Sequence, residues 1–311
     1  MRFAPVLCGV AITVACDVAC AQPNAIDLDR TPPAAALAEF WTEQQLRQTP
    51  PLPLPVLDAD TEPLNPATPN SAAPPGQSKG SQPSAIARRS GNVNTMPLAW
   101  AGKLYFVLPD GRPANCSAQF VAPDTLVTAA HCVRDSQSGA WHQNLLYRHQ
   151  YDRGRATNFA GACKTTYRAW VAPDKSRYPW DYAMVMLRGS VEQGHFGIEW
   201  GWLGKYSNAP KIGYPGDIED GEVIQVDFGR LGQGWHPNIV ALVHGNSRSL
   251  NGSSGGAWVG AYDPRGNNQA NRVISVSSHF RERDPGTMYG PYWDDAMAQL
   301  LANTRRDCRR T

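Results

Sequence analysis

A sharp change in composition near Ser90 divides the chain into two parts. Of its 26 prolines, 13 lie in the 69 residues from Gln22 to Ser90, where Phe40 and Trp41 are the only aromatic residues. A stretch so poor in large apolar side chains buries too little surface to offset the entropy lost on ordering. The sequence therefore predicts a disordered, Pro-rich linker or pro-region over residues 22–90 and a folded domain over residues 91–311.

One short helix is expected inside the Pro-rich region. The run from Ala34 to Gln48 follows Thr31, a suitable N-cap, and places Leu37, Phe40 and Trp41 on one face. Because such a helix is marginal alone in water, Phe40 and Trp41 are expected to pack against the downstream domain. An exposed, partly helical tail is the alternative.

The first residues resemble an export signal. Met1-Arg2 precede a mostly apolar run from Pro5 to Ala15, and Ala19-Cys20-Ala21 fits the small-x-small rule for cleavage before Gln22. We therefore expect a signal peptide over residues 1–21 and a secreted or periplasmic protein. An uncleaved anchor is the alternative, although the run is short for a transmembrane helix.

Four of the seven cysteines follow this signal, an even number that suits two disulfides in an oxidising compartment. Three pairings are possible among Cys116, Cys132, Cys163 and Cys308. A zinc site would require clustered Cys or His residues, and only His131-Cys132 are adjacent. The sequence predicts neither a metal nor another cofactor.

The net charge of the chain does not point to a particular kind of binding partner. With 29 Lys and Arg against 27 Asp and Glu, the formal net charge is +2, too small to argue for nucleic acid or an anionic membrane. We expect a monomer with no nucleic-acid partner and no stable membrane insertion.

Beyond Arg89, short runs of aromatic and β-branched residues alternate with Gly, Pro, Asn and Asp clusters, which is typical of an all-β barrel or sandwich. The expected strands cover residues 103–108, 118–121, 125–129, 183–187, 222–228, 239–243 and 272–277.

The end of the chain has helical periodicity instead. The spacing of Met297, Leu300, Thr304 and Cys308 predicts an amphipathic helix over residues 293–306. Because Cys308 lies on or near the buried stripe, this placement favours a disulfide, most simply with Cys163.

The segment Asn251-Gly252-Ser253-Ser254-Gly255-Gly256 carries the clearest chemical signal. A serine between glycines can be held on a tight turn where backbone N–H groups converge, which gives a nucleophile and an oxyanion site. A flexible Gly/Ser loop is the alternative reading of this motif alone.

A serine hydroxyl needs a base, and candidates occur elsewhere in the chain. His131 lies in Thr-Ala-Ala-His-Cys, after a strand-like run. Asp181 begins the apolar stretch Asp-Tyr-Ala-Met-Val-Met-Leu, 50 residues after His131 and 73 before Ser254. At the start of a strand, this carboxylate could reach an imidazole while partly shielded from water.

These three signatures, in the order His, Asp, Ser, resemble the trypsin/chymotrypsin-like serine endopeptidases. Residues 102–106, 116–118 and 213–217 are similar to segments of the secreted bacterial glutamyl endopeptidases. The resemblance covers about residues 98–301 and implies two antiparallel six-stranded β-barrels with the active site between them. The terminal helix fits this architecture.

The resemblance also implies the role of each residue. Ser254 would attack the scissile carbonyl, His131 would transfer the proton, and Asp181 would orient the imidazole. The N–H groups of Gly252 and Ser254 would form the oxyanion hole. Cys116 and Cys132 would form the disulfide of the histidine loop, and Ser278 would support Asp181.

Substrate preference has weaker support. Arg248 and its neighbour Ser249 stand at the position of the family's pocket base, where Arg248 could pair with an acidic side chain. Arg248 as a solvated loop charge is the alternative. The glutamyl branch carries its recognition histidine where Ser277 stands here, and His279 lies two residues further on the same face.

The sequence argues against two other functions. An α/β-hydrolase esterase would need an acid and then a histidine after the serine, and the 57 residues that follow Ser254 offer no convincing pair. A protease-like protein retained for binding or envelope structure usually lacks a triad member. The sequence therefore predicts a secreted serine endopeptidase that acts on proteins or peptides, made with a pro-region as a zymogen.

Overall fold

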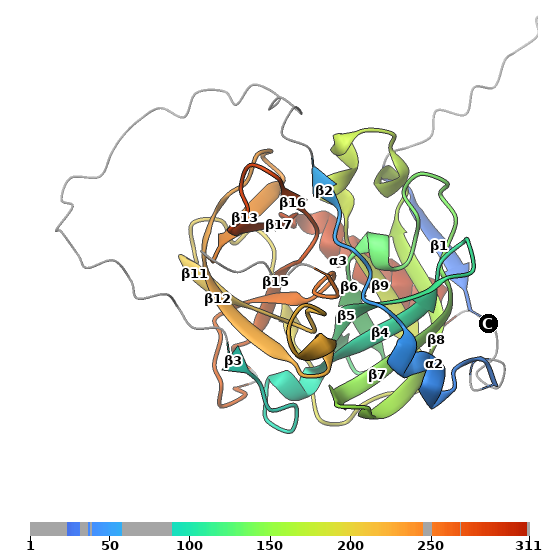
Figure 1. The fold of residues 1–311 in the computed structure, drawn as a ribbon. Coiled ribbons are helices and arrows are strands. Elements are labelled where there is room, and N and C mark those ends of the chain that lie inside the picture. Colours follow the sequence, from blue (N-terminus) through green and yellow to red (C-terminus); the bar gives the residue numbers. More distant parts are fainter. Residues whose placement is uncertain are drawn as a thin grey trace, which may run out of the picture.

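The computed structural model describes residues 24–31, 37, 39–57, 89–244, 251–267 and 269–309 (Figure 1). The predicted signal peptide lies outside the described residues, as do Arg248 and Ser249. Within the described part of the chain, no helix is long and apolar enough to cross a membrane.

The first barrel is a sheet of six antiparallel strands that closes on itself. Its strands are β4 (Ala101–Val107), β5 (Pro113–Ala122), β6 (Thr125–Thr128), β7 (Gln143–Asp152), β8 (Arg155–Tyr167) and β9 (Ala183–Leu187). Pairing between β8 and β9 closes the sheet. Alternate side chains such as Leu104, Phe106 and Phe120 are completely buried and fill the interior.

The second barrel has six main strands and two short ones. The main strands are β11 (Asn208–Gly213), β12 (Gln225–Gln233), β13 (Ile239–Val243), β14 (Ala257–Gly260), β15 (Arg272–Val276) and β17 (Thr287–Pro291), and the short ones are β3 (Arg89–Ser90) and β10 (Gly197–Ile198). Backbone hydrogen bonds between His279 and Tyr289 join the segment after β15 to β17. The predicted fold of two six-stranded antiparallel barrels is confirmed.

All seven predicted strands are present, although β5 begins five residues before its predicted start and β12 ends five residues after its predicted end. Strands β7, β8, β11, β14 and β17 were not predicted. Polar and charged residues interrupt several of these strands: Lys164 in β8 and Lys211 in β11 are both buried, so their apolar alternation is broken.

The predicted C-terminal helix is α3 (Asp295–Asp307), and it begins two residues later than expected because Asp294 caps it by accepting a hydrogen bond from the Ala296 N–H, at 2.9 Å. Met297, Leu300 and Thr304 are buried, as the periodicity indicated. Cys308 forms a disulfide with Cys163 of β8, as the sequence favoured.

The N-terminal segment differs from the expected linker, because residues 26–30 form a strand, β1 (Ile26–Arg30). It pairs with β8 from Ile26↔Tyr167 to Arg30↔Cys163, along a part of β8 that β7 does not reach. Backbone N–H and C=O groups at an open sheet edge are available to any extended chain, whatever its side chains. This pairing is therefore invisible to an analysis of composition.

Charge also holds β1 in place. Asp27 bridges Arg134, at 2.7 Å, and Arg168, at 2.7 Å. Partial burial alone would raise the pKa of Asp27, but the two guanidinium groups lower it below its usual value. Since Arg134 lies three residues after His131, the N-terminal strand is tied to the histidine loop.

A single helix over residues 34–48 is not what forms. Leu37, Glu39 and Phe40 are helical, the helix is interrupted at Trp41 and Thr42, and α2 (Glu43–Gln48) then starts at a capping box between Thr42 and Gln45. Thr31, the expected cap, instead donates its hydroxyl hydrogen to the carbonyl of Gly161. Trp41 packs against Tyr105 of the first barrel, which confirms the expected contact with the downstream domain.

Removing the Cys163–Cys308 disulfide should destabilise the domain strongly. This bond closes a loop of 145 residues, for which chain-entropy arguments give up to about 5 kcal/mol. We expect the Cys163→Ala/Cys308→Ala variant to melt at least about 10 °C below the unchanged chain in calorimetry. The matched control is Cys116→Ala/Cys132→Ala, whose smaller loop predicts a smaller loss. Equal melting temperatures for the Cys163/Cys308 variant and the unchanged chain would contradict this expectation.

Candidate active site

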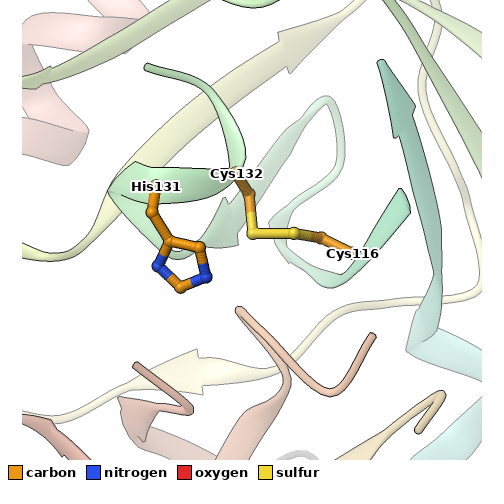
Figure 2. Close-up of side chains that lie close together, drawn as sticks. All are labelled: Cys116, His131 and Cys132. Atoms are coloured by element: carbon orange, nitrogen blue, oxygen red, sulfur yellow. A yellow bond between two sulfur atoms is a disulfide. The ribbon is translucent and has the colours of Figure 1, made fainter. Parts of the chain in front are cut away.

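His131 lies on a short 3-10 turn, η2 (Ala130–Cys132), directly after β6. The turn is anchored because Cys132 is bonded to Cys116 of β5, and Figure 2 shows the imidazole ring beside this disulfide. One side-chain atom of each of these three residues lies within 4.8 Å of the others. The two sulfurs are bonded to each other and offer no thiolate to a metal, so the cluster serves to fix the histidine.

Asp181 follows the 3-10 turn η4 (Lys175–Trp180) and is completely buried. Its carboxylate accepts hydrogen bonds from the backbone N–H of His131 at 2.9 Å and from the ring Nδ1 at 2.8 Å. The Ser278 hydroxyl donates a further bond, at 2.6 Å. Burial alone would raise the pKa of Asp181, but the charge of His131 and these hydrogen bonds lower it, so the group is a carboxylate that accepts from three donors.

The loop that carries Ser254 requires its glycines. Gly252 has a φ of +80°, and a Cβ there would lie 2.6 Å from the carbonyl oxygen of Tyr214. Gly255 has a φ of +74°, and its Cβ would lie 2.8 Å from the backbone nitrogen of Ala129. Only glycine tolerates both the dihedral angle and the close approach. The second contact brings the serine loop against the residue two positions before His131.

Hydrogen bonds fix the serine loop between the two barrels. The Ser254 carbonyl accepts from the N–H of Ser117 in β5, at 2.8 Å, and the Gly255 N–H donates to the carbonyl of Ser277, at 2.8 Å. The structure therefore joins His131, Asp181 and Ser278 by hydrogen bonds at one junction and brings the loop that carries Ser254 against Ala129 beside them. Within the described residues, the buried atoms Ser254 Oγ and His131 Nε2 have no hydrogen-bond partner.

Residues 50–57, which we call the covering segment, run between the two barrels over this junction. Figure 1 shows it as the blue chain between α2 and the short strand β2 (Val56–Leu57). On the first barrel, Leu52 N–H donates to the carbonyl of Asn115, at 2.8 Å. On the second barrel, β2 pairs in parallel with β16 (Phe280–Arg281), and Phe280 N–H donates to the carbonyl of Pro55, at 3.0 Å.

The covering segment also contacts the serine loop itself. The Gly252 N–H, one of the two predicted oxyanion donors, donates to the carbonyl of Leu52, at 3.2 Å. Leu54 N–H donates to the side-chain oxygen of Asn251, at 3.3 Å, and the Leu54 side chain is buried in the apolar cluster that contains Phe280. Because a peptide N–H has one hydrogen, Gly252 cannot donate to a substrate while it donates to Leu52.

Ser278 and His279 are both completely buried. Ser278 takes the place that the resemblance implied, in contact with Asp181. Both ring nitrogens of His279 are occupied: Nε2 accepts from the indole N–H of Trp235 at 2.9 Å, and Nδ1 lies 2.9 Å from Ser278 Oγ. The ring is therefore part of the support beneath Asp181 in this structure.

The sequence analysis missed the covering segment and the contact with Trp235. A signal for the first exists, because Pro51, Pro53 and Pro55 alternate with Leu52, Leu54 and Val56, and period-two alternation is typical of an extended chain laid on a surface. No signal in the sequence connects Trp235 with His279, which lies 44 residues later.

Comparisons with protein-family models and with curated proteins find no match, whereas solved structures are similar. The Arthrobacter nicotinovorans protease Anisep has a TM-score of 0.56 at 22% identity, over 69% of this chain and 97% of its own.

Two further structures agree. The thermostable serine protease AL20 from an extremophilic microorganism has a TM-score of 0.56 at 24% identity, over 66% of this chain and 97% of its own. A Glu endopeptidase has a TM-score of 0.57 at 15% identity, over 70% of this chain and 96% of its own. At these identities the likeness is one of fold: the chain has the fold of the trypsin-like serine proteases.

Proposed function

We propose that this protein is a serine endopeptidase that hydrolyses peptide bonds through Ser254, His131 and Asp181. The contacts of the Asp181 carboxylate with the backbone and ring of His131 carry the proposal, because they hold a ring hydrogen on Nδ1, in the tautomer whose lone pair is on Nε2. A ring held in this tautomer can act as a general base toward a serine hydroxyl.

The proposed reaction has two steps. Ser254 Oγ attacks the scissile carbonyl while His131 Nε2 takes its proton, and the N–H groups of Gly252 and Ser254 stabilise the oxyanion. His131 then gives this proton to the amine that leaves, and an acyl-enzyme ester forms on Ser254. Water, activated by His131 in the same way, hydrolyses the ester and restores the hydroxyl.

Export is the second part of the proposal. Support comes from the predicted signal peptide and from the two disulfides, since such bonds persist in oxidising compartments. We place the protein in the periplasm or outside the cell, in a bacterium.

Latency is the third part. We propose that the chain is made as a zymogen, in which the covering segment holds the Gly252 N–H and lies over the serine loop. Prolines 50, 51, 53 and 55 restrict the segment before it binds, so little conformational entropy is lost when it covers the site. The residue before Ser254 is Ser253, whose side chain is uncharged. An ion pair between this side chain and a newly formed N-terminus therefore cannot activate the protein.

Residue preference depends on Arg248, six residues before Ser254. We propose acidic side chains before the scissile bond as the substrates to test first, because a guanidinium pairs well with a carboxylate. Cleavage sites in a denatured protein mixture, read by mass spectrometry, decide this point. Cuts after Glu or Asp would assign Arg248 to the pocket, and cuts after other residues would remove that role while keeping the peptidase.

The proposal as a whole is tested by labelling with a fluorophosphonate, which reacts only with an activated serine. We expect one adduct, located by mass spectrometry on Ser254 and not on the adjacent Ser253. The full chain is compared with a variant in which residues 50–57 are replaced by alternating Gly and Ser, to allow for the covering segment. Absence of label in both forms, or a label elsewhere, would favour a catalytically silent binding or envelope protein.

A further inference from the structure

We propose that His279 and Trp235 act as positioning residues for the catalytic acid, by directing the hydroxyl hydrogen of Ser278 toward Asp181. This inference rests on the proposed peptidase function and extends it by two residues. The contacts form one chain: Trp235 Nε1 to His279 Nε2 at 2.9 Å, His279 Nδ1 to Ser278 Oγ at 2.9 Å, and Ser278 Oγ to Asp181 Oδ2 at 2.6 Å.

Donor and acceptor chemistry fixes every hydrogen in this chain. An indole nitrogen only donates, so Nε2 of His279 must be the bare acceptor nitrogen. A neutral imidazole then carries its hydrogen on Nδ1, which donates to the hydroxyl oxygen of Ser278. The single hydroxyl hydrogen of Ser278 therefore has one acceptor left, the Asp181 carboxylate.

The surroundings of His279 disfavour protonation of its ring and hold the ring in place by packing. Burial lowers the pKa of His279 to about 3, although the negative charge of Asp181 acts in the opposite direction. The positive charge of Arg281, and that of His131 when its ring is protonated, also oppose protonation of His279. Tyr178 and Tyr289 pack against the ring, with centroids at 4.4 and 5.5 Å.

The Trp235 N–H decides between two arrangements. Without it, the imidazole hydrogen of His279 can move to Nε2, and Nδ1 then accepts the hydroxyl hydrogen of Ser278. Asp181 would lose one of its donors, and a carboxylate with fewer donors is more basic and holds a protonated His131 more strongly. The tryptophan thus acts on Asp181 through His279 and Ser278.

The first test measures the tautomer directly in the full chain labelled with ¹⁵N-histidine. NMR should show the His279 hydrogen on Nδ1. His149 is an internal control with the opposite tautomer, because its Nε2 must donate to the carbonyl of Ala99, at 2.6 Å. A hydrogen on Nε2 of His279 would overturn the proposal, and this result does not depend on whether the chain hydrolyses peptides.

The second test uses Trp235→Phe, which removes the N–H and keeps an aromatic ring. We expect kcat/KM to fall about fivefold, the size of one hydrogen bond, and the acidic limb of its pH profile to move up by about half a pH unit. Trp202→Phe is the matched control, because Trp202 donates to the Ile274 carbonyl, at 2.8 Å, away from the triad. A fall in activity with an unmoved acidic limb would show a packing role only and overturn the proposal.

A double variant distinguishes two effects of Trp235→Phe: a new hydrogen bond from the Ser278 hydroxyl to His279 Nδ1, and a loss of packing. In Trp235→Phe/His279→Phe, no imidazole competes for the Ser278 hydrogen, so the acidic limb should return toward its original position. A limb that stays as in Trp235→Phe, in a variant that folds, would contradict the mechanism. If no form hydrolyses peptides, the proposed function fails, while the NMR tautomer still decides the arrangement of His279.

Discussion

Exchanging Asp181 for asparagine is expected to slow peptide hydrolysis by about four orders of magnitude. The amide keeps the shape of the carboxylate, but its NH₂ group can only donate. Three groups now donate to the carboxylate: the His131 ring at 2.8 Å, the His131 backbone N–H at 2.9 Å and the Ser278 hydroxyl at 2.6 Å. In the asparagine variant they would compete for one remaining oxygen. The imidazole would favour the tautomer with its hydrogen on Nε2, which cannot take a proton from Ser254.

The measurement is kcat/KM for a peptide substrate, with Ser254→Ala as the baseline for hydrolysis that does not use the triad. Asp294→Asn is the matched control, because it makes the same chemical change at the N-cap of α3, where asparagine caps as well as aspartate. We expect near-normal activity from this control. An Asp181→Asn variant within tenfold of the unchanged chain would remove Asp181 from the proposed mechanism.

The double barrel was predictable from the sequence largely because the motifs that resemble a known family lie in it. Composition alone indicated a barrel or sandwich, and it located strands such as β9, whose five residues are all buried. It missed β8, where Lys164 is completely buried and pairs with Asp29, at 2.6 Å. A lysine inside a strand breaks the apolar pattern, and its partner lies far away in sequence.

The candidate site shows the same division. His131, Asp181 and Ser254 lie in local motifs, which is why the sequence could propose them, and the structure adds the contacts of Asp181 with His131 and Ser278. The position of Trp235 against His279 depends on how the turn between β12 and β13 meets the segment after β15, which no local pattern encodes. Proline content predicted a linker or pro-region over residues 22–90, but it could not reveal the backbone pairing of β1 and of the covering segment with the barrels.

Replacing the covering segment, residues 50–57, by alternating Gly and Ser should raise peptide hydrolysis by the full chain at least about 100-fold. Six hydrogen bonds join this segment to Asn115, Asn251, Gly252 and β16 or the residue after it. Leu54 adds the burial of one apolar side chain. Even at the low end of their usual net values, these contacts stabilise the covered state by several kcal/mol. A Gly/Ser chain makes no apolar contact and loses more entropy on ordering.

The rate of fluorophosphonate labelling measures the same opening, because the reagent needs Ser254 and the oxyanion donors but no peptide pocket. The matched control replaces residues 70–77 with the same Gly/Ser sequence. This change leaves β1 and the covering segment as they are. We expect this control to stay as slow as the unchanged chain. The point variant Leu54→Asp, which puts a carboxylate into the apolar cluster around Phe280, should give an intermediate rate. If all four chains label equally fast, the segment does not block the site. Since Gly252 has a single N–H to offer, a bound Leu52 carbonyl and a bound substrate exclude each other, and the balance between them would set the proposed latency.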